Sequence, residues 1–371
     1  MLRGIIKFLP LTTCVGAALL AAPGYALAKD DALQMVSIDV EGGGGTLFVT
    51  PDGKSLLIDT GNPEVSRATG DHPSSERIAA AAQALGVRKI DYLLTTHYHI
   101  DHIGGLEGLL ARMPIDTYID HGENRETTAS PMPGAAQIDM NNPPPRSTAF
   151  GYRQYVKLIG KHRHIVANPG DVFHIGGMTV TIVAADAQMI AKPLPGAGEA
   201  NPDCAGMDAM ANNGGEENAR STSSVIGYGK VKIAAFGDLT WDREKDLFCP
   251  TDKVGKVDVY LATHHGTALS GSAAAVNALS PVVAIVGNSP RKGADAARMK
   301  TIQASPRIQD VWQLHTTTVS PDANVAADRI ANSGTDQGKD KFYGLRLRIK
   351  KSGEITVINE RNGFNKTYGA K

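Results

Sequence analysis

Two stretches of this chain repeat one nine-residue pattern that ends in a histidine. Lys89–His97 reads KIDYLLTTH and Lys256–His264 reads KVDVYLATH, so Lys, Asp, Leu, Thr and His recur in step. Short apolar runs of this kind are typical of buried strands, and each strand would place a histidine at its C-terminal end. Function in layered α/β proteins collects at such ends. We therefore expect two similar halves that face each other around one site.

Strand and helix patterns alternate around both stretches and predict a layered α/β domain. Near the N-terminus we expect a helix at Ser75–Leu85, capped by Ser74 or Ser75, and later a helix at Tyr152–Lys161. The other predicted strands are Met35–Val40, Thr46–Thr50, Ser55–Asp59, Asp91–Thr96, Ser223–Tyr228, Val231–Phe236, Asp258–Thr263 and Val282–Val286. The other predicted helices and hairpins are Gly105–Met113, Ala273–Leu279, Ala296–Ser305, Val172–Ala184 and Phe342–Asn359.

Two irregular insertions interrupt this pattern, near residues 120–150 and 190–220. The first is rich in Pro, Asn, Ser and Thr and includes Pro143–Pro145. We interpret it as a surface loop and as a candidate to flank the active site.

Length and charge limit the class of protein. The chain has 371 residues, and Lys plus Arg equal Asp plus Glu at 38 each. A formal charge of zero provides no global basic field for nucleic acid, and no clear basic patch stands out. The length allows one large domain or two modest ones, and we predict a single domain over residues 29–371.

The N-terminus has the layout of a secretory signal peptide. Arg3 and Lys7 precede an apolar run, Leu9–Ala22, which is too short for a good transmembrane helix, and Ala26–Ala28 forms a small-x-small cleavage site. We predict that residues 1–28 are removed and that the mature protein is periplasmic or secreted. No other segment is apolar enough to span a bilayer.

Cleavage at that point removes Cys14 and leaves Cys204 and Cys249. Two cysteines in an oxidising compartment can pair. Sequence alone cannot bring their Cα atoms within reach, so a disulfide and two free thiols both stay open.

The most specific motif is Thr96–Gly105, which reads THYHIDHIGG. Neutral imidazole and carboxylate are good ligands for zinc and similar divalent ions. In a loop just past a strand, alternate residues turn to opposite sides and can serve two ions. The candidate ligands are His97, His99, Asp101 and His102.

This motif resembles the signature of the metallo-β-lactamase-fold hydrolases, and further stretches over most of the mature chain support the resemblance. They are Asp39–Gly44, Leu56–Gly61, Phe236–Asp238 and Thr263–Gly266. The resemblance implies a four-layer αββα sandwich with the site at the strand ends between two similar halves. It also implies that Asp59 orients the metal-binding loop and that Asp238 bridges two metals.

The resemblance further implies that one of His264 and His265 binds metal while the other hydrogen-bonds nearby or meets substrate. The internal repeat favours His264 as the ligand. His265 and Asp101 are then the candidate catalytic residues, and Tyr98 is a weaker candidate to position substrate or protonate the leaving group.

The chain departs from many relatives because Glu217–Ser224, where they carry another metal-binding histidine, contains none. In this it looks most like the subgroup with the hydrolase domain of DNA-uptake competence proteins and phosphorylcholine esterases. An asparagine often stands there, so Asn218 is a candidate weak ligand. One or two Zn²⁺ ions are expected, with Mn²⁺ as an alternative.

The resemblance implies a hydrolase in which a bound metal lowers the pKa of water to about 7 so that hydroxide is available, and the predicted signal peptide implies that this hydrolase is exported. The subgroup favours a phosphoester or phosphodiester substrate. Two alternatives stay open: a β-lactam or lactone hydrolase, and a non-catalytic binding module that metal stabilises. The sequence leaves the natural substrate and the oligomeric state open.

Overall fold

The structure is a computed structural model that describes residues 31–66, 68–129, 135–207, 215–334 and 342–370. These residues belong to one compact unit, Asp31–Lys371. The predicted signal peptide over residues 1–28, with Cys14, lies outside the described residues. No helix of the described residues is long and apolar enough to cross a membrane.

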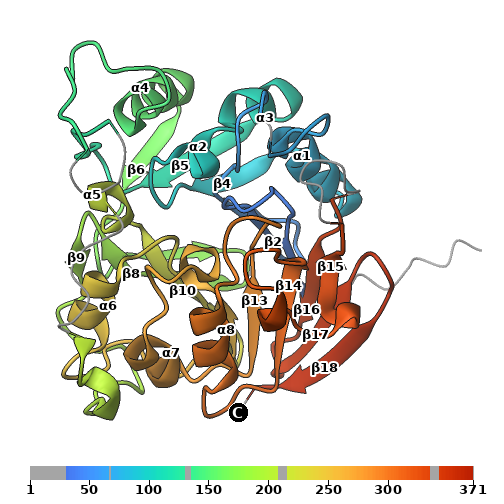
Figure 1. The fold of residues 1–371 in the computed structure, drawn as a ribbon. Helices are drawn as coiled ribbons and strands as arrows, with labels where there is room; N and C mark the ends of the chain where they lie inside the picture. Colours follow the sequence, from blue (N-terminus) through green and yellow to red (C-terminus); the bar gives the residue numbers. More distant parts are fainter. Residues whose placement is uncertain (1–30, 67, 130–134, 208–214, 335–341, 371) are drawn as a thin grey trace, which may run out of the picture. The chain divides into compact units, whose positions relative to one another are not determined.

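Two sheets form the centre of this unit (Figure 1). The first sheet runs in the order β18 (Asn365–Gly369), β17 (Glu354–Asn359), β16 (Leu345–Ile349), β1 (Leu33–Ser37), β2 (Thr46–Val49), β3 (Ser55–Ile58), β4 (Ile90–Leu94), β5 (Ile115–Asp120) and β6 (Arg163–Val166). The second runs β15 (Ile330–Asn332), β14 (Asp310–His315), β13 (Val283–Val286), β12 (Val259–Leu261), β11 (Val231–Ala235), β10 (Ser223–Tyr228), β8 (Met178–Ala185) and β7 (Val172–Ile175), and β9 (Gln188–Met189) pairs with β8. In each sheet the strands that lead to the site are parallel, β3 to β6 in one and β11 to β15 in the other.

Helices cover the outer face of each sheet (Figure 1). The first sheet carries α1 (Ser74–Ala84), α2 (Ile100–Ile103), α3 (Leu106–Arg112) and α4 (Thr148–Ile159). The second carries α6 (Trp241–Phe248), α7 (Ala273–Leu279) and α8 (Ala296–Gln303), and α5 (Gly215–Asn218) lies between β9 and β10 in the chain.

The period-2 alternation of the strands explains these layers. In β3, Leu56 and Ile58 belong to the apolar cluster between the two sheets, whereas Leu57 belongs to the cluster under the first set of helices. In β11, Ile233 faces the other sheet and Ala234 packs under the second set of helices. The fold is therefore the predicted four-layer αββα sandwich, and the two repeats contribute the equivalent strands β4 and β12.

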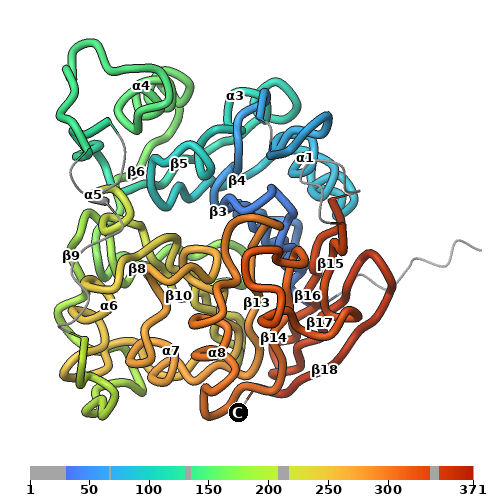
Figure 2. The backbone as a smooth tube through the Cα atoms, viewed as in Figure 1, coloured from blue at the N-terminus to red at the C-terminus, as the bar shows by residue number. Residues whose placement is uncertain are grey.

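The structure differs from the sequence predictions at several elements. The strands β5, β6, β14 and β18 were not predicted. The cap of α1 is Pro73, because Ser74 instead accepts a hydrogen bond from Asn62 N (2.9 Å). Helix α4 begins at Thr148, before the predicted start, since Ser147 Oγ accepts from Phe150 N and caps it. The chain between β5 and α4 loops out beside α4 (Figure 2), but its first part is buried at Asn124 and Glu126.

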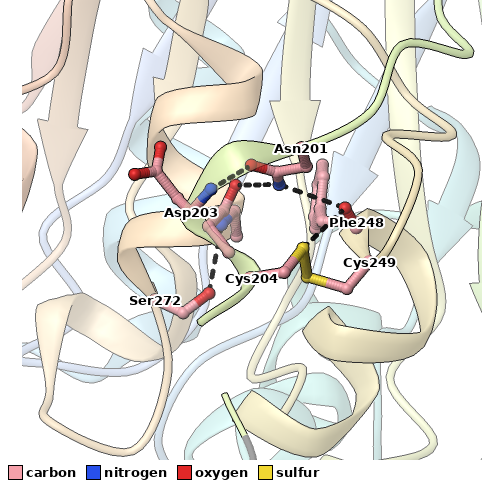
Figure 3. Close-up of a disulfide and its surroundings, with 8 residues drawn as sticks. Asn201, Asp203, Cys204, Phe248, Cys249 and Ser272 are labelled. Carbon is pink, nitrogen blue, oxygen red and sulfur yellow. Dashed lines mark hydrogen bonds between the residues drawn. A yellow bond between two sulfur atoms is a disulfide. The ribbon is translucent and has the colours of Figure 1, made fainter. Parts of the chain in front are cut away.

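Cys204 and Cys249 form a disulfide with Cα atoms 5.7 Å apart (Figure 3). The bond joins the second insertion to the end of α6. Asn201 strengthens the same connection, since its Nδ2 donates to Phe248 O and to Ala274 O, both at 3.0 Å.

Candidate metal centre

The loops at the strand ends bring the two repeats into contact. Thr222 N donates to Thr96 O (2.8 Å), and His264 N donates to Gly237 O (2.9 Å). Gly237 has φ +59°, and a Cβ there would lie 2.7 Å from the Cβ of Thr96. Only glycine permits so close an approach of the two halves in this conformation.

Asp238 lies inside a ring of buried histidines from both repeats. Its Oδ2 is 3.3 Å from His264 Nε2, 3.4 Å from His102 Nε2 and 4.0 Å from His97 Nε2. Its Oδ1 is 3.5 Å from His265 Nε2. The sequence-predicted residues His97, His102, Asp238, His264 and His265 thus converge although they come from separate parts of the chain.

Asp101 adds a second carboxylate to this ring. Its Oδ2 is 3.5 Å from His102 Nε2 and 3.7 Å from His265 Nε2. Two groups of donors result, each with its atoms within 4.8 Å of one another, and His102 belongs to both. They are His97, His102 and Asp238, and Asp101, His102 and His265.

In each of these four histidines, Nδ1 faces away from the centre and contacts an oxygen of a neighbouring residue. His102 Nδ1 lies 2.8 Å from Asp59 Oδ2, and Asp59 Oδ1 accepts from Thr96 N (2.8 Å). The remaining Nδ1 partners are Thr96 Oγ1 at 3.0 Å for His97, Ser270 Oγ at 3.3 Å for His264 and the Gly287 carbonyl at 3.2 Å for His265. Such contacts fix the tautomer and leave Nε2 as a donor atom toward the centre.

His99 completes the first side of the ring in the opposite orientation. Its Nδ1 lies 3.1 Å from His97 Nε2, and its Nε2 lies 3.2 Å from Glu126 Oε2. Thr148 Oγ1 donates to the other oxygen of Glu126 (2.6 Å). Glu126 was missed by the sequence analysis because it lies in the irregular first insertion, where no periodicity marks a buried residue.

A sequence model described as the metallo-beta-lactamase superfamily matches residues 41–186, which include Asp59 and the stretch from His97 to His102. Residues 41–186 are therefore similar to the metallo-beta-lactamase superfamily. Asp238, His264 and His265 lie beyond the match, and the fold brings them to it.

Among curated proteins, the hydroxyacylglutathione hydrolase of Stenotrophomonas maltophilia is 27% identical over 124 residues, which are 33% of this chain and 37% of that protein. The chain therefore spans little more than a third of the length of this relative. Among solved structures, the metallo-beta-lactamase fold protein YhfI from Bacillus subtilis is 13% identical with a TM-score of 0.42, over 76% of this chain and 96% of that one. The diiron beta-hydroxylase CmlA from Streptomyces venezuelae is 13% identical with a TM-score of 0.35, over 69% and 44%.

The donor set of this site fits a divalent metal. Within the described residues, Nε2 of His102 and Nε2 of His265 are buried and have no hydrogen-bond partner. Leaving buried polar atoms without a partner is unfavourable, by about 1–3 kcal/mol each. A bound cation would use both lone pairs. The types of donor and these two nitrogens without a partner therefore both indicate a divalent-metal site.

Two histidines of the ring, His97 and His264, are neutral at neutral pH, whereas Asp238 and Asp101 outweigh burial and raise the pKa of His102 well above its usual value. Burial lowers the pKa of His264 to about 4 and also places that of His97 well below its usual value. Burial would raise the pKa of Asp238, but His264 and His102 outweigh it and hold that pKa well below its ordinary range. Neutral imidazoles and ionised carboxylates are the forms that bind metal.

Two further residues predicted from the sequence, Asn218 and Tyr98, are both buried but lie outside the histidine ring. Asn218 is buried, and among the described residues its Oδ1 has no hydrogen-bond partner. Its neighbour Glu217 accepts from His121 Nε2 (2.7 Å) and from Tyr98 N (3.1 Å). Tyr98 is fully buried and its hydroxyl donates to the Gly122 carbonyl. Its side chain therefore lies in the core and not beside a substrate.

The glycine-rich turn between β1 and β2 packs against Asp101 and Asp59 of the centre. Gly44 N donates to the Asp101 carbonyl (3.0 Å). A Cβ at Gly43 would lie 2.2 Å from that carbonyl oxygen, and one at Gly44 would lie 2.5 Å from Asp59 Oδ2. Neither position has room for a side chain, so the backbone itself supports Asp101 and Asp59.

A buried ion network anchors the start of this turn. Arg77 Nη1 lies 3.0 Å from Asp39 Oδ2 and 3.7 Å from Glu41 Oε1, and His315 Nε2 lies 2.7 Å from Asp39 Oδ1. Asp39, Glu41 and His315 have the spacing of a metal site. However, the guanidinium of Arg77 already supplies the cation, so these residues form a structural ion network.

Proposed function

We propose that this protein is an exported metal-dependent hydrolase that acts on phosphoesters or phosphodiesters. The observation that carries the proposal is the buried ring around Asp238, with the partnerless Nε2 atoms of His102 and His265 directed toward two carboxylates. The metallo-beta-lactamase superfamily match supports the same chemistry, since the curated relative is named a hydrolase.

We assign two metal positions to this ring. His97 Nε2 and His99 Nδ1 would hold an ion at the first position, with Asn218 as a weak further ligand. Asp101, His102 and His265 would hold an ion at the second, and Asp238 lies between the two. The repeat favoured His264 as the ligand, but His265 is the one grouped with Asp101 and His102. We therefore assign metal binding to His265 and leave His264 to orient Asp238 and substrate.

Zn²⁺ is the ion that best suits this mixture of imidazole and carboxylate, and Mn²⁺ is an alternative. A divalent ion would lower the pKa of a water molecule and polarise the electrophile of the substrate. Asp101 is ionised, because Lys292 and His102 outweigh the effect of burial and hold its pKa well below its usual range. Its carboxylate would orient the attacking water by accepting a hydrogen bond from it.

The absence of a histidine in Glu217–Ser224 supports a phosphoester over a β-lactam, because this set of side chains differs from that of efficient lactam-cleaving relatives. Export is supported by the Cys204–Cys249 bond, since disulfides persist in oxidising compartments. An acyl substrate is the second candidate, and the relative named hydroxyacylglutathione hydrolase favours it.

The test compares hydrolysis of bis(p-nitrophenyl) phosphate and nitrocefin by the metal-stripped protein before and after Zn²⁺ is restored. We expect turnover of the phosphodiester that depends on metal and is lost in Asp101→Ala with the fold retained. Preference for nitrocefin would transfer the proposal to acyl substrates. No metal-dependent turnover of either, with a partner protein still bound by the wild type, would leave the binding module as the function.

A further inference from the structure

Lys292 lies on the connection between β13 and α8, and its backbone is held in a tight turn. Ser289 N donates to the Lys292 carbonyl (2.9 Å), and Lys292 N donates to Ser289 Oγ (3.1 Å). The next residues tie this turn to the centre, since Ala294 N donates to the His265 carbonyl (3.0 Å). Gly293 has φ +82°, and a Cβ there would lie 2.2 Å from the same carbonyl oxygen. The position of Lys292 relative to His265 is thus fixed by backbone contacts.

The ammonium of Lys292 approaches the centre from the side of the centre that is exposed to solvent. Its Nζ forms an ion pair with Asp101 Oδ2, the oxygen that also faces His102 and His265. The side chain of Lys292 is 38% exposed, whereas those of His265 and Asp238 are 6% and 4% exposed. Lys292 therefore touches both the ring and the solvent from which a substrate arrives.

A bound divalent ion would make the centre more positive. In the present structure Lys292 neutralises one of the two carboxylates, Asp101 and Asp238. A divalent ion would take over that role for Asp101. Even one such ion, together with the ammonium, outweighs both carboxylates, so the solvent-exposed side would carry excess positive charge. A site of this kind favours an anionic ligand and stabilises negative charge that develops on it.

We propose that Lys292 is a specificity-determining residue that binds an anionic oxygen of the substrate beside the metal. This rests on the proposed function and narrows it to substrates that carry a negative charge next to the bond that is cleaved, such as phosphodiesters. A neutral ester would gain nothing from this contact. If Lys292 had a purely structural role and only neutralised Asp101, the protein would show no preference for anionic over neutral substrates.

The direct test measures binding of inorganic phosphate by calorimetry to protein loaded with Zn²⁺, after the metal content of each variant is confirmed. Lys292→Gln should weaken phosphate binding about ten- to a hundredfold, the range for a lost hydrogen bond to a charged group. Lys292→Arg keeps the charge and should stay within about threefold of wild type. Lys300→Gln, an exposed lysine on α8, is the matched control and should leave binding unchanged.

Kinetics then separate this inference from the proposed function. Lys292→Gln should raise KM for bis(p-nitrophenyl) phosphate by a much larger factor than KM for p-nitrophenyl acetate, whereas any effect that acts through Asp101 should change kcat for both substrates alike. Unaltered phosphate binding and KM in Lys292→Gln would overturn the role of Lys292 while leaving the hydrolase intact. Absence of turnover in the wild type would instead overturn the proposed function, and the phosphate titration would still decide the role of Lys292.

Discussion

Replacing Glu126 by alanine removes the carboxylate that holds His99 from behind. In the wild type, Glu126 Oε2 lies 3.2 Å from His99 Nε2 and Oε1 accepts from Thr148 Oγ1 at 2.6 Å. This arrangement keeps a proton on Nε2 and presents Nδ1 to His97 and to a metal. Without Glu126, the ring of His99 can rotate or change tautomer, so the first metal position loses an oriented ligand.

The size of the effect follows from these two contacts. Losing a carboxylate behind a ligating histidine typically weakens metal binding about 10- to 100-fold, or about 1.4–2.7 kcal/mol. The metal-free fold is also affected, because Glu126→Ala leaves the partly buried ring N–H of His99 and the buried hydroxyl of Thr148 without this partner. At about 1–3 kcal/mol for each, the free energy of unfolding should fall by about 2–6 kcal/mol. Glu126→Gln can still accept from one group and donate to the other, so its effect should be smaller on both counts.

The assay is competition for Zn²⁺ with a chromophoric chelator, combined with urea unfolding of the metal-free protein. Glu123→Gln is the matched control, since Glu123 lies in the same loop and its side chain is 77% exposed. Zn²⁺ affinity of Glu126→Ala equal to that of the wild type would refute the positioning role, whatever happens to stability.

Two further predictions concern stability. Burial raises the pKa of Glu244 to about 7, so the folded chain holds a proton that the unfolded chain releases above about pH 4.5. The free energy of unfolding should therefore fall as pH rises from about 5 to 7, by at most about 1.4 kcal/mol per pH unit from this group. Urea unfolding of metal-free Glu244→Gln should show a shallower slope, and parallel slopes would contradict the assignment. Paired Cys204→Ser and Cys249→Ser substitutions should cost about 2–4 kcal/mol of stability. Zn²⁺ uptake should stay unchanged, because the bond lies at the opposite end of α6 from Asp238, and impaired uptake would show that the second insertion supports the centre.

The sequence predicts the parts of the fold whose signal is local and periodic. The repeats ending in His97 and His264 are strands of opposite sheets, because an apolar run of that length has few other ways to be buried. The histidine motif likewise concentrates its chemistry in consecutive residues. By contrast, β5 and β14 were missed although both lie in the sheets, since no turn or alternation sets them apart in the sequence.

The residues that complete the centre were not predictable in the same way. Glu126 and Lys292 reach His99 and Asp101 through loops whose course depends on tertiary packing. Nothing near them in sequence indicates a ligand. The proposal of His265 rather than His264 as a ligand also rests on the fold, since both residues have positive φ, at 54° and 58°, in a turn that no strand pattern predicts.

The central claim is that side chains at or just after the ends of the two repeats hold divalent metal around Asp238, and elemental analysis tests it most directly. The protein, loaded with Zn²⁺ and dialysed, should retain one or two ions per chain, and Asp238→Ala should lose them while remaining folded by circular dichroism. Wild-type protein that retains no stoichiometric metal, or an Asp238→Ala variant that retains as much as the wild type, would contradict the account.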